Sequence, residues 1–111
     1  MARGRMFAFS NPASPDREAD YNRWYDGIHG DEVTSLPGVG SMKRYRAVAQ
    51  MNPLAKQPAH AYVAVYKLDD IDTAMKAFGA AAATFTMSDA MDLQNALVMV
   101  YEDVTADPLQ G

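Results

Sequence analysis

The apolar positions of the chain follow two periods, and together they predict four strands and two helices. Alternation with period two, or a continuous apolar run in the last case, predicts strands over residues 6–10, 39–50, 61–68 and 93–102. The alternation is clearest in the third of these, where every second residue from Tyr62 to Leu68 shares one face. The last strand is apolar on both faces from Ala96 to Val100, so we expect both of its faces to be covered.

The first helix is predicted to begin at residues 14–16, which supply a capping hydroxyl, a proline and an acidic residue. Aromatic and apolar side chains then recur at helical spacing as far as Ile28. Gly27 and Gly30 weaken this helix by about 1 kcal/mol each relative to alanine. We therefore expect either a break or a tight packing contact near Gly30, with Asp31 capping a further turn.

A second helix is predicted after Asp69-Asp70, which can cap its first turn. Its buried stripe is expected to comprise Ile71, Ala74, Met75, Phe78 and Ala82. Two prolines predict a loop over residues 51–58, and the tail over residues 103–111 is polar.

The order strand, helix, strand, strand, helix, strand predicts one α+β domain over residues 1–111. It is the order of the ferredoxin-like βαββαβ fold, a four-stranded antiparallel sheet with two helices on one face. The other face then needs cover, because apolar and aromatic side chains point out of both sides of the sheet. A second copy of the chain is the simplest cover, so we expect a homodimer.

Composition excludes several classes of protein. The formal net charge of −4 argues against a nucleic-acid partner, which requires a concentrated basic face. With no cysteine, disulfides, thiolate metal sites and cysteine nucleophiles are excluded. The basic residues at the N-terminus precede an apolar run too short for a signal peptide, and no stretch is long enough to span a membrane. We therefore expect a cytoplasmic protein with no membrane partner.

The residues best suited to chemistry gather in one stretch, residues 22–40. Tyr25 and His29 are four positions apart and therefore share a helix face, which we expect to open into a cleft between sheet and helices. An imidazole can move a proton near neutral pH, and a phenol can donate a hydrogen bond to a substrate oxygen. Asp26 lies three positions before His29, where its carboxylate can accept the imidazole N–H. Trp24 is expected to pack on the sheet and to line or back the cleft.

Four further side chains are predicted to bind substrate, namely Asn11, Phe9, Tyr45 and Tyr62. Packing is the simpler role for the aromatic residues, and an Asx turn is the simpler role for Asn11. His29 alternatively caps its helix. His29 and His60 match no metal-binding spacing, so neither a metal nor a cofactor is expected.

The pattern also resembles a known group of proteins. It comprises Asn11-Pro12, Asn22-x-Trp24-Tyr25-x-x-x-His29-x-Asp31, Pro37-Gly38 and Arg44-Tyr45. These residues resemble the dimeric α/β-barrel superfamily, and most closely its EthD-like and muconolactone-isomerase-like small proteins. The resemblance implies that two ferredoxin-like subunits pair their sheets into a barrel and that each keeps a cleft between its sheet and its helices. The enzymes of this superfamily include lactone isomerases, polyketide cyclases, lyases and monooxygenases. The resemblance therefore implies a particular fold but does not imply a particular reaction.

These observations together predict a cofactor-free enzyme that uses acid–base catalysis. Its substrate is expected to be a small, largely apolar or aromatic-derived carbonyl compound, and its reaction to be of isomerase, cyclase or lyase type. Two alternatives stay open. One is a non-catalytic ligand-binding or stress-related dimer, and the other is a cofactor-free or haem-linked monooxygenase.

Overall fold

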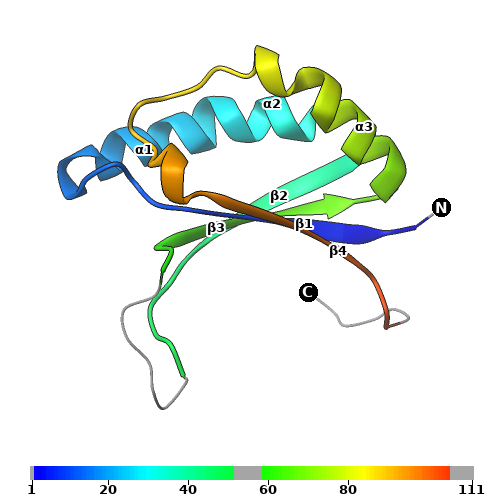
Figure 1. Ribbon diagram of the computed structural model, residues 1–111, viewed down its shortest axis with the longest axis horizontal. Helices are drawn as coiled ribbons and strands as arrows, with labels where there is room; N and C mark the ends of the chain where they lie inside the picture. The colour runs from blue at the N-terminus through cyan, green and yellow to red at the C-terminus, as the bar shows by residue number, and fades with distance from the viewer. Residues whose placement is uncertain (1, 52–58, 106–111) are drawn as a thin grey trace.

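The computed structural model describes residues 2–51 and 59–105, and its elements follow the predicted order (Figure 1). The helices and strands are β1 (Gly4–Ser10), α1 (Glu18–Trp24), the π-helical turn η2 (Tyr25–His29), α2 (Gly30–Thr34), β2 (Val39–Arg46), β3 (Tyr62–Leu68), α3 (Ile71–Ala81) and β4 (Leu97–Glu102). Short 3-10 turns cover Pro15–Arg17 (η1), Ala82–Thr84 (η3) and Leu93–Asn95 (η4). Residues 52–58 of the predicted loop and residues 106–111 of the predicted tail lie outside the described part of the chain.

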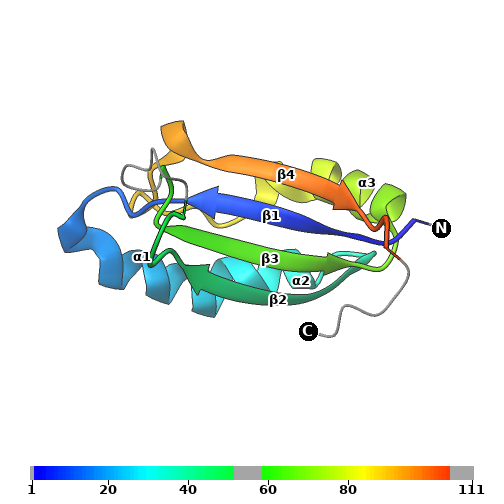
Figure 2. The same ribbon diagram turned by 90° about the horizontal axis from the view of Figure 1, so that it is seen from below.

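The four strands form one antiparallel sheet in the order β2-β3-β1-β4 (Figure 2). In β1, Met6 is paired with Tyr66 of β3 on one side and with Val100 of β4 on the other. The helices of the described residues all lie on one face of this sheet and leave its other face open (Figure 1). This arrangement confirms the predicted ferredoxin-like fold. None of the helices in the described residues has the length and apolarity that crossing a membrane requires.

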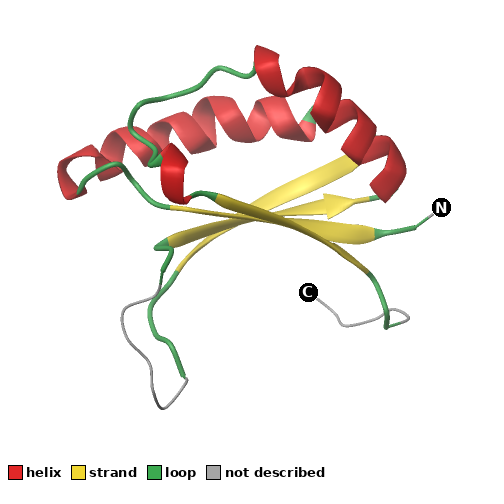
Figure 3. Ribbon diagram, viewed as in Figure 1, coloured by secondary structure: helices red, strands yellow, loops and turns green. Residues whose placement is uncertain are grey.

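The core fills the space between the helix layer and the sheet, which Figure 3 shows in red and yellow. As predicted, β3 buries every second residue, from Tyr62 to Leu68. The helix layer contributes three buried aromatic residues, Tyr21, Trp24 and Tyr25, along with Val33. Aromatic side chains therefore dominate the contact between the first helix and the sheet.

The first helical segment runs from Pro15 to Thr34 without a break at Gly30. The predicted tight packing contact at Gly30 is confirmed, because a Cβ atom on this residue would lie 2.6 Å from Cε of Met42. The predicted cap at Asp31 is wrong: this residue lies inside α2, and its carbonyl accepts a hydrogen bond from the Ser35 amide at 3.1 Å. The helix instead changes its period, since the Gly30 amide donates to the carbonyl of Tyr25, five residues earlier.

The turn between α2 and β2 depends on Gly38, whose φ of +83° lies in the left-handed region. A Cβ atom at this position would lie 2.7 Å from the backbone nitrogen of Ala74 in α3. The Gly38 carbonyl accepts a hydrogen bond from the Asp69 amide at 2.8 Å. This glycine therefore lets the turn pack directly against the start of α3.

The helix α3 and the strand β4 are more exposed than predicted. Met75 is 51% exposed and Ala82 is also exposed, so within the predicted stripe of α3 only Ala74 is buried, while Ile71 and Phe78 are half-buried. The strand β4 lies at the edge of the sheet, and most of its apolar side chains are exposed in the single chain. The predicted cover on both faces of this strand is therefore not provided within one chain. The second strand is also shorter than predicted, ending at Arg46.

Candidate functional site

A small cavity lies between the sheet and the helices, with a volume of about 60 Å³. Its walls come from β1, the first helix, β3, α3 and the segment that leads into β4. The lining residues are Met6, Ala8, Phe9, Ser10, Tyr25, His29, Val33, Tyr66, Phe78, Met91, Ala96 and Val98. Most of these side chains are apolar, so the few polar groups among them determine what the cavity can bind.

The imidazole of His29 is held on several sides by aromatic rings. It stacks on the Trp24 indole with 4.7 Å between ring centroids and 16° between ring planes. The rings of Tyr25 and Phe85 contact it edge-on, at 5.1 Å and 5.5 Å. The π turn produces this stack, because it brings residues five apart onto the same side of the helix.

The same enclosure sets the charge of His29. Burial lowers the pKa of the imidazole, and the nearby carboxylate of Glu32 offsets part of this effect. Its Nδ1 atom is buried and has no hydrogen-bond partner among the described residues. At neutral pH, His29 is therefore an uncharged imidazole with one ring nitrogen available to accept a proton.

The lowered pKa of His29 predicts a loss of stability in acid. The unfolded chain takes up a proton on this histidine near its ordinary pKa of 6.5, whereas the folded chain does so only at lower pH. The stabilising effect of an uncharged His29 is therefore complete above about pH 6.5 and declines as the pH falls toward the folded-state value. In urea titrations between about pH 7.5 and about pH 5.5, we expect wild type to lose more unfolding free energy than His29→Gln. Equal losses in the two proteins would contradict this prediction.

Tyr25 lies beside His29, as the sequence predicts, and is only 2% exposed. Burial raises the pKa of its phenol to about 12, although the neighbouring Tyr66 phenol and the Arg44 guanidinium both lower it. The phenol is therefore neutral at pH 7 and available as a hydrogen-bond donor.

Asp26 does not orient the imidazole of His29. Its carboxylate instead accepts a hydrogen bond from Nη1 of Arg44 at 2.9 Å, and its side chain is largely exposed. The second guanidinium nitrogen of Arg44 donates to the Asn22 side chain at 2.9 Å. The predicted contact is missing because the acidic side chain points to the outer edge of β2, where Arg44 lies.

Arg44 also organises a cluster of tyrosines. Its guanidinium lies over the rings of Tyr21, Tyr25 and Tyr62, at 5.2, 4.6 and 5.0 Å from their centroids. The hydroxyl of Tyr62 donates to Glu18 at 2.6 Å. Cation–π contacts of this kind stabilise a partly buried cation.

Two of the predicted substrate-binding residues therefore line a different hollow. Tyr45 and Tyr62 lie with Asp26, Arg44 and Arg46 around an open hollow of about 470 Å³ at the β2 edge. The structure does not bring these side chains to the cavity that contains His29.

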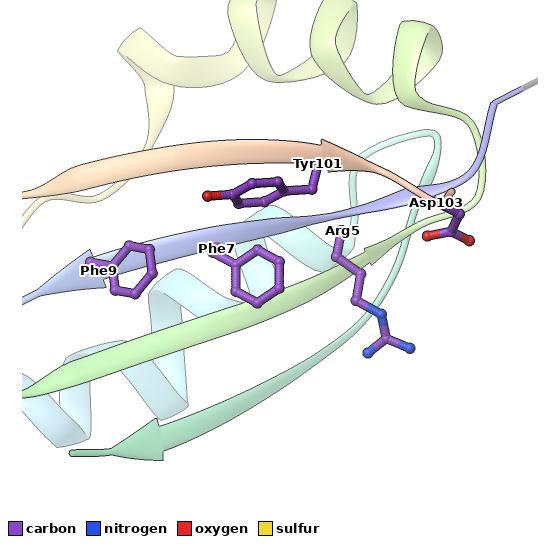
Figure 4. A pocket seen from close by; sticks show the side chains of 5 residues that line it. All are labelled: Arg5, Phe7, Phe9, Tyr101 and Asp103. Atoms are coloured by element: carbon purple, nitrogen blue, oxygen red, sulfur yellow. The ribbon is translucent and has the colours of Figure 1, made fainter. Parts of the chain in front are cut away.

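The remaining predicted residues have other positions. Asn11 ties the start of β3 to the end of β1, because its amide donates to the Ala59 carbonyl at 3.1 Å and accepts from the Ala61 amide at 2.6 Å. The ring of Phe9 lies on the open face of the sheet, near Phe7 and Tyr101, although Phe9 also forms part of the cavity wall (Figure 4).

Trp24 packs behind the imidazole, and its indole N–H donates to the Thr86 carbonyl at 2.7 Å. His60 lies away from His29, and its Nε2 pairs with the Asn95 carbonyl at 2.6 Å. Across residues 2–51 and 59–105, no three His, Asp or Glu side chains are grouped so that they could hold a metal ion.

Tyr66 is a member of the cavity that the residue types did not indicate, because a strand tyrosine is most often a packing residue. The alternation along β3 already placed it on the inner face with Tyr62. What the sequence lacked was any sign that its hydroxyl has no partner among the described residues, which depends on neighbours distant in the chain.

The sheet order, the single helix layer and the cavity between them define a small ferredoxin-like α+β protein. Among solved structures, the chain is similar to the crystal structure of an ethyl tert-butyl ether D (EthD) family protein from Bacillus halodurans C-125. The two share 19% sequence identity with a TM-score of 0.59, over 94% of this chain and 100% of the other. The chain therefore has the EthD-like fold. No protein family defined by sequence matches it, and no curated protein matches it either.

Proposed function

We propose that this protein is a cofactor-free enzyme that moves a proton on a small, mainly apolar carbonyl compound. The observation that carries the proposal is a ring nitrogen of His29 that has no hydrogen-bond partner among the described residues. It belongs to an uncharged imidazole that lines a mainly apolar cavity together with a neutral phenol. Buried polar groups normally have partners, and exceptions of this kind are frequent at functional sites.

In this mechanism, His29 accepts a proton from the carbon next to a carbonyl group. The electron pair of the broken C–H bond moves into the carbonyl, which becomes an enolate. Tyr25 stabilises the developing negative charge on oxygen by donating its phenolic hydrogen bond. The imidazolium then returns the proton to the same or to another carbon, and the second outcome is an isomerisation.

The size of the cavity restricts the substrate. One water needs about 10–15 Å³, and a cavity of about 150 Å³ takes up benzene. The cavity of about 60 Å³ therefore admits the reacting end of a molecule, and a larger substrate must keep its remaining part at the opening.

Hydrogen–deuterium exchange on a panel of compounds tests the proposal, and it does not require the natural substrate to be identified first. Small ketones and unsaturated lactones are incubated with the protein in D₂O, and the loss of C–H signals next to the carbonyl is followed by proton NMR. We expect exchange above the buffer rate for at least one compound of the panel. Compounds that bind without exchange would favour the non-catalytic alternative, and the catalytic proposal would then be abandoned.

We also propose that a second copy of the chain covers the open face of the sheet. This face carries a hollow of about 420 Å³ lined by Arg5, Phe7, Phe9, Tyr101 and Asp103 (Figure 4). Strand pairing places Met99 opposite Phe7 and Leu97 opposite Phe9, so the exposed apolar side chains of β4 continue the same surface. An apolar surface of this extent is typical of a protein interface.

If the proposed dimer forms through this face, two variants that each add a carboxylate should differ in oligomeric state. Phe7→Glu places a carboxylate at the centre of the proposed interface and is expected to give monomers in sedimentation equilibrium. Met75→Glu adds the same charge on the exposed side of α3 and is expected to leave the dimer intact. A monomeric wild type, or a Phe7→Glu variant that stays dimeric, would contradict the proposed interface.

A further inference from the structure

Tyr66 occupies the middle of β3 on the inner face of the sheet, opposite Met6 of β1. Its side chain is 1% exposed, and its hydroxyl is buried with no partner in hydrogen-bond geometry among the described residues. The phenol of Tyr25 lies near enough to raise the pKa of Tyr66, but the two hydroxyls do not meet that geometry. An unpaired buried hydroxyl is destabilising, and a folded protein normally pairs such a group with protein, water or ligand.

The neighbouring tyrosines make different use of their hydroxyls. The hydroxyl of Tyr21 is 2.6 Å from the Ser10 hydroxyl, and the hydroxyl of Tyr62 donates to Glu18 at 2.6 Å. Both of these phenols complete a hydrogen bond within the protein, whereas Tyr66 fills the same layer of the core without one among the described residues. Packing alone would be served equally well by phenylalanine at this position.

Tyr66 lines the cavity that contains His29, whose Nδ1 is also buried without a partner among the described residues. The two unpaired atoms therefore belong to side chains that face a common space with mainly apolar walls. None of the described residues that line this space is a lysine, arginine, aspartate or glutamate. A buried carboxylate without a cation is strongly disfavoured, so the residues select an uncharged ligand with an oxygen acceptor.

The polar atoms and the exposed lining residues of the cavity belong to different elements of the fold. The polar atoms of its lining that have no partner among the described residues come from Tyr66 of β3 and His29 of the first helical segment. Its exposed lining residues, Ala96 and Val98, lie at the β4 edge. Val98 is 49% exposed, so the cavity approaches the surface there. A ligand that enters from this edge places its oxygen toward Tyr66 and its apolar body against β4.

We propose that Tyr66 binds the ligand's carbonyl oxygen, and that the ligand is an uncharged ketone or related carbonyl compound whose apolar part lies toward Val98. This inference rests on the cavity of the proposed function and assigns to it a second hydrogen-bond donor besides Tyr25. Burial keeps the phenol protonated, since it raises the pKa of Tyr66 well above the ordinary value.

A pair of matched probes isolates the contribution of the oxygen. 4-Fluoroacetophenone and 4-fluoro-α-methylstyrene have nearly the same shape, but a CH₂ group replaces the carbonyl oxygen in the second. In ¹⁹F NMR titrations, we expect wild type to bind the ketone about 2- to 10-fold more tightly, the range for one neutral hydrogen bond. Tyr66→Phe should reduce this preference by weakening ketone binding alone, and the part that Tyr25 contributes should persist.

Two further variants make the result specific. Tyr62→Phe removes a phenol from the same face of β3 outside the cavity, so the preference for the ketone should persist. Val98→Trp fills the opening at the β4 edge and should weaken the binding of both probes. Because the hydroxyl of Tyr66 has no partner among the described residues, Tyr66→Phe should unfold at the same or a higher urea concentration than wild type.

The inference is overturned if neither probe binds wild type, or if Tyr66→Phe retains the full wild-type preference for the ketone. Lower stability of unliganded Tyr66→Phe would likewise assign the hydroxyl a structural role. A preference for the ketone that depends on Tyr66 without any deuterium exchange would leave this inference standing and reject the proposed catalysis.

Discussion

Replacing His29 with alanine is expected to lower the rate of deuterium exchange on a responsive ketone by about 10²–10⁴-fold, the usual contribution of a general base. Among the described residues that line the cavity, His29 supplies the base that is uncharged and available near neutral pH. The phenols of Tyr25 and Tyr66 cannot replace it, because burial raises the pKa of both. Exchange rates measured by proton NMR on wild type and variant check this prediction.

The control for this variant is His60→Ala, which removes the other histidine of the chain. His60 pairs with the Asn95 carbonyl and does not line the cavity, so the exchange rate should stay at the wild-type level. Retained exchange in a correctly folded His29→Ala protein would reject His29 as the base.

Replacing Tyr21 with alanine is expected to lower the free energy of unfolding by about 3–5 kcal/mol, the usual cost of removing a large buried aromatic side chain. Tyr21 is fully buried, and its ring contacts those of Tyr25 and Tyr62. A domain of this size typically has a free energy of unfolding of only about 5–15 kcal/mol, so this substitution removes a large part of its stability. Urea unfolding followed by circular dichroism measures it.

Two further variants separate the contribution of the Tyr21 hydroxyl and that of burial from the total loss of stability. Tyr21→Phe keeps the ring but leaves the buried Ser10 hydroxyl without its partner, and we expect a loss of about 1–3 kcal/mol. Tyr45→Ala removes an exposed tyrosine from β2 and should cost far less than Tyr21→Ala. Similar losses for the buried and the exposed tyrosine would show that the tyrosine cluster around Arg44 does not support the core.

The two proposals for the cavity assign its polar groups different tasks. His29 moves the proton, whereas Tyr25 and Tyr66 hold the oxygen on which negative charge develops. Arg44 lies 4.6 Å from the ring centroid of Tyr25, so its charge acts on this phenol from behind the ring. The Arg44–Asp26 ion pair therefore supports the position of Tyr25 from outside the cavity.

The position of Asp26 illustrates the limit of reasoning from helical spacing. Three positions on an ideal helix bring Asp26 toward His29, but the π turn rotates the residues between them. Arg44 then offers the carboxylate a closer partner from a strand eighteen residues away. Local spacing restricts which groups can meet, and the charge on a distant strand selects among them.

The sequence by itself determined the order of the elements and the inner face of β3, because burial of one face requires period two in a strand and period 3.6 in a helix. It also brought Tyr25 beside His29, since four residues make just over one turn of an α-helix. Only the tertiary structure decided that Trp24 stacks on the imidazole, that Asp26 pairs with Arg44, and that the Tyr66 hydroxyl is left unpaired among the described residues. Each of these depends on the geometry of the π turn or on neighbours far apart in the chain, and no local pattern of residues encodes such contacts.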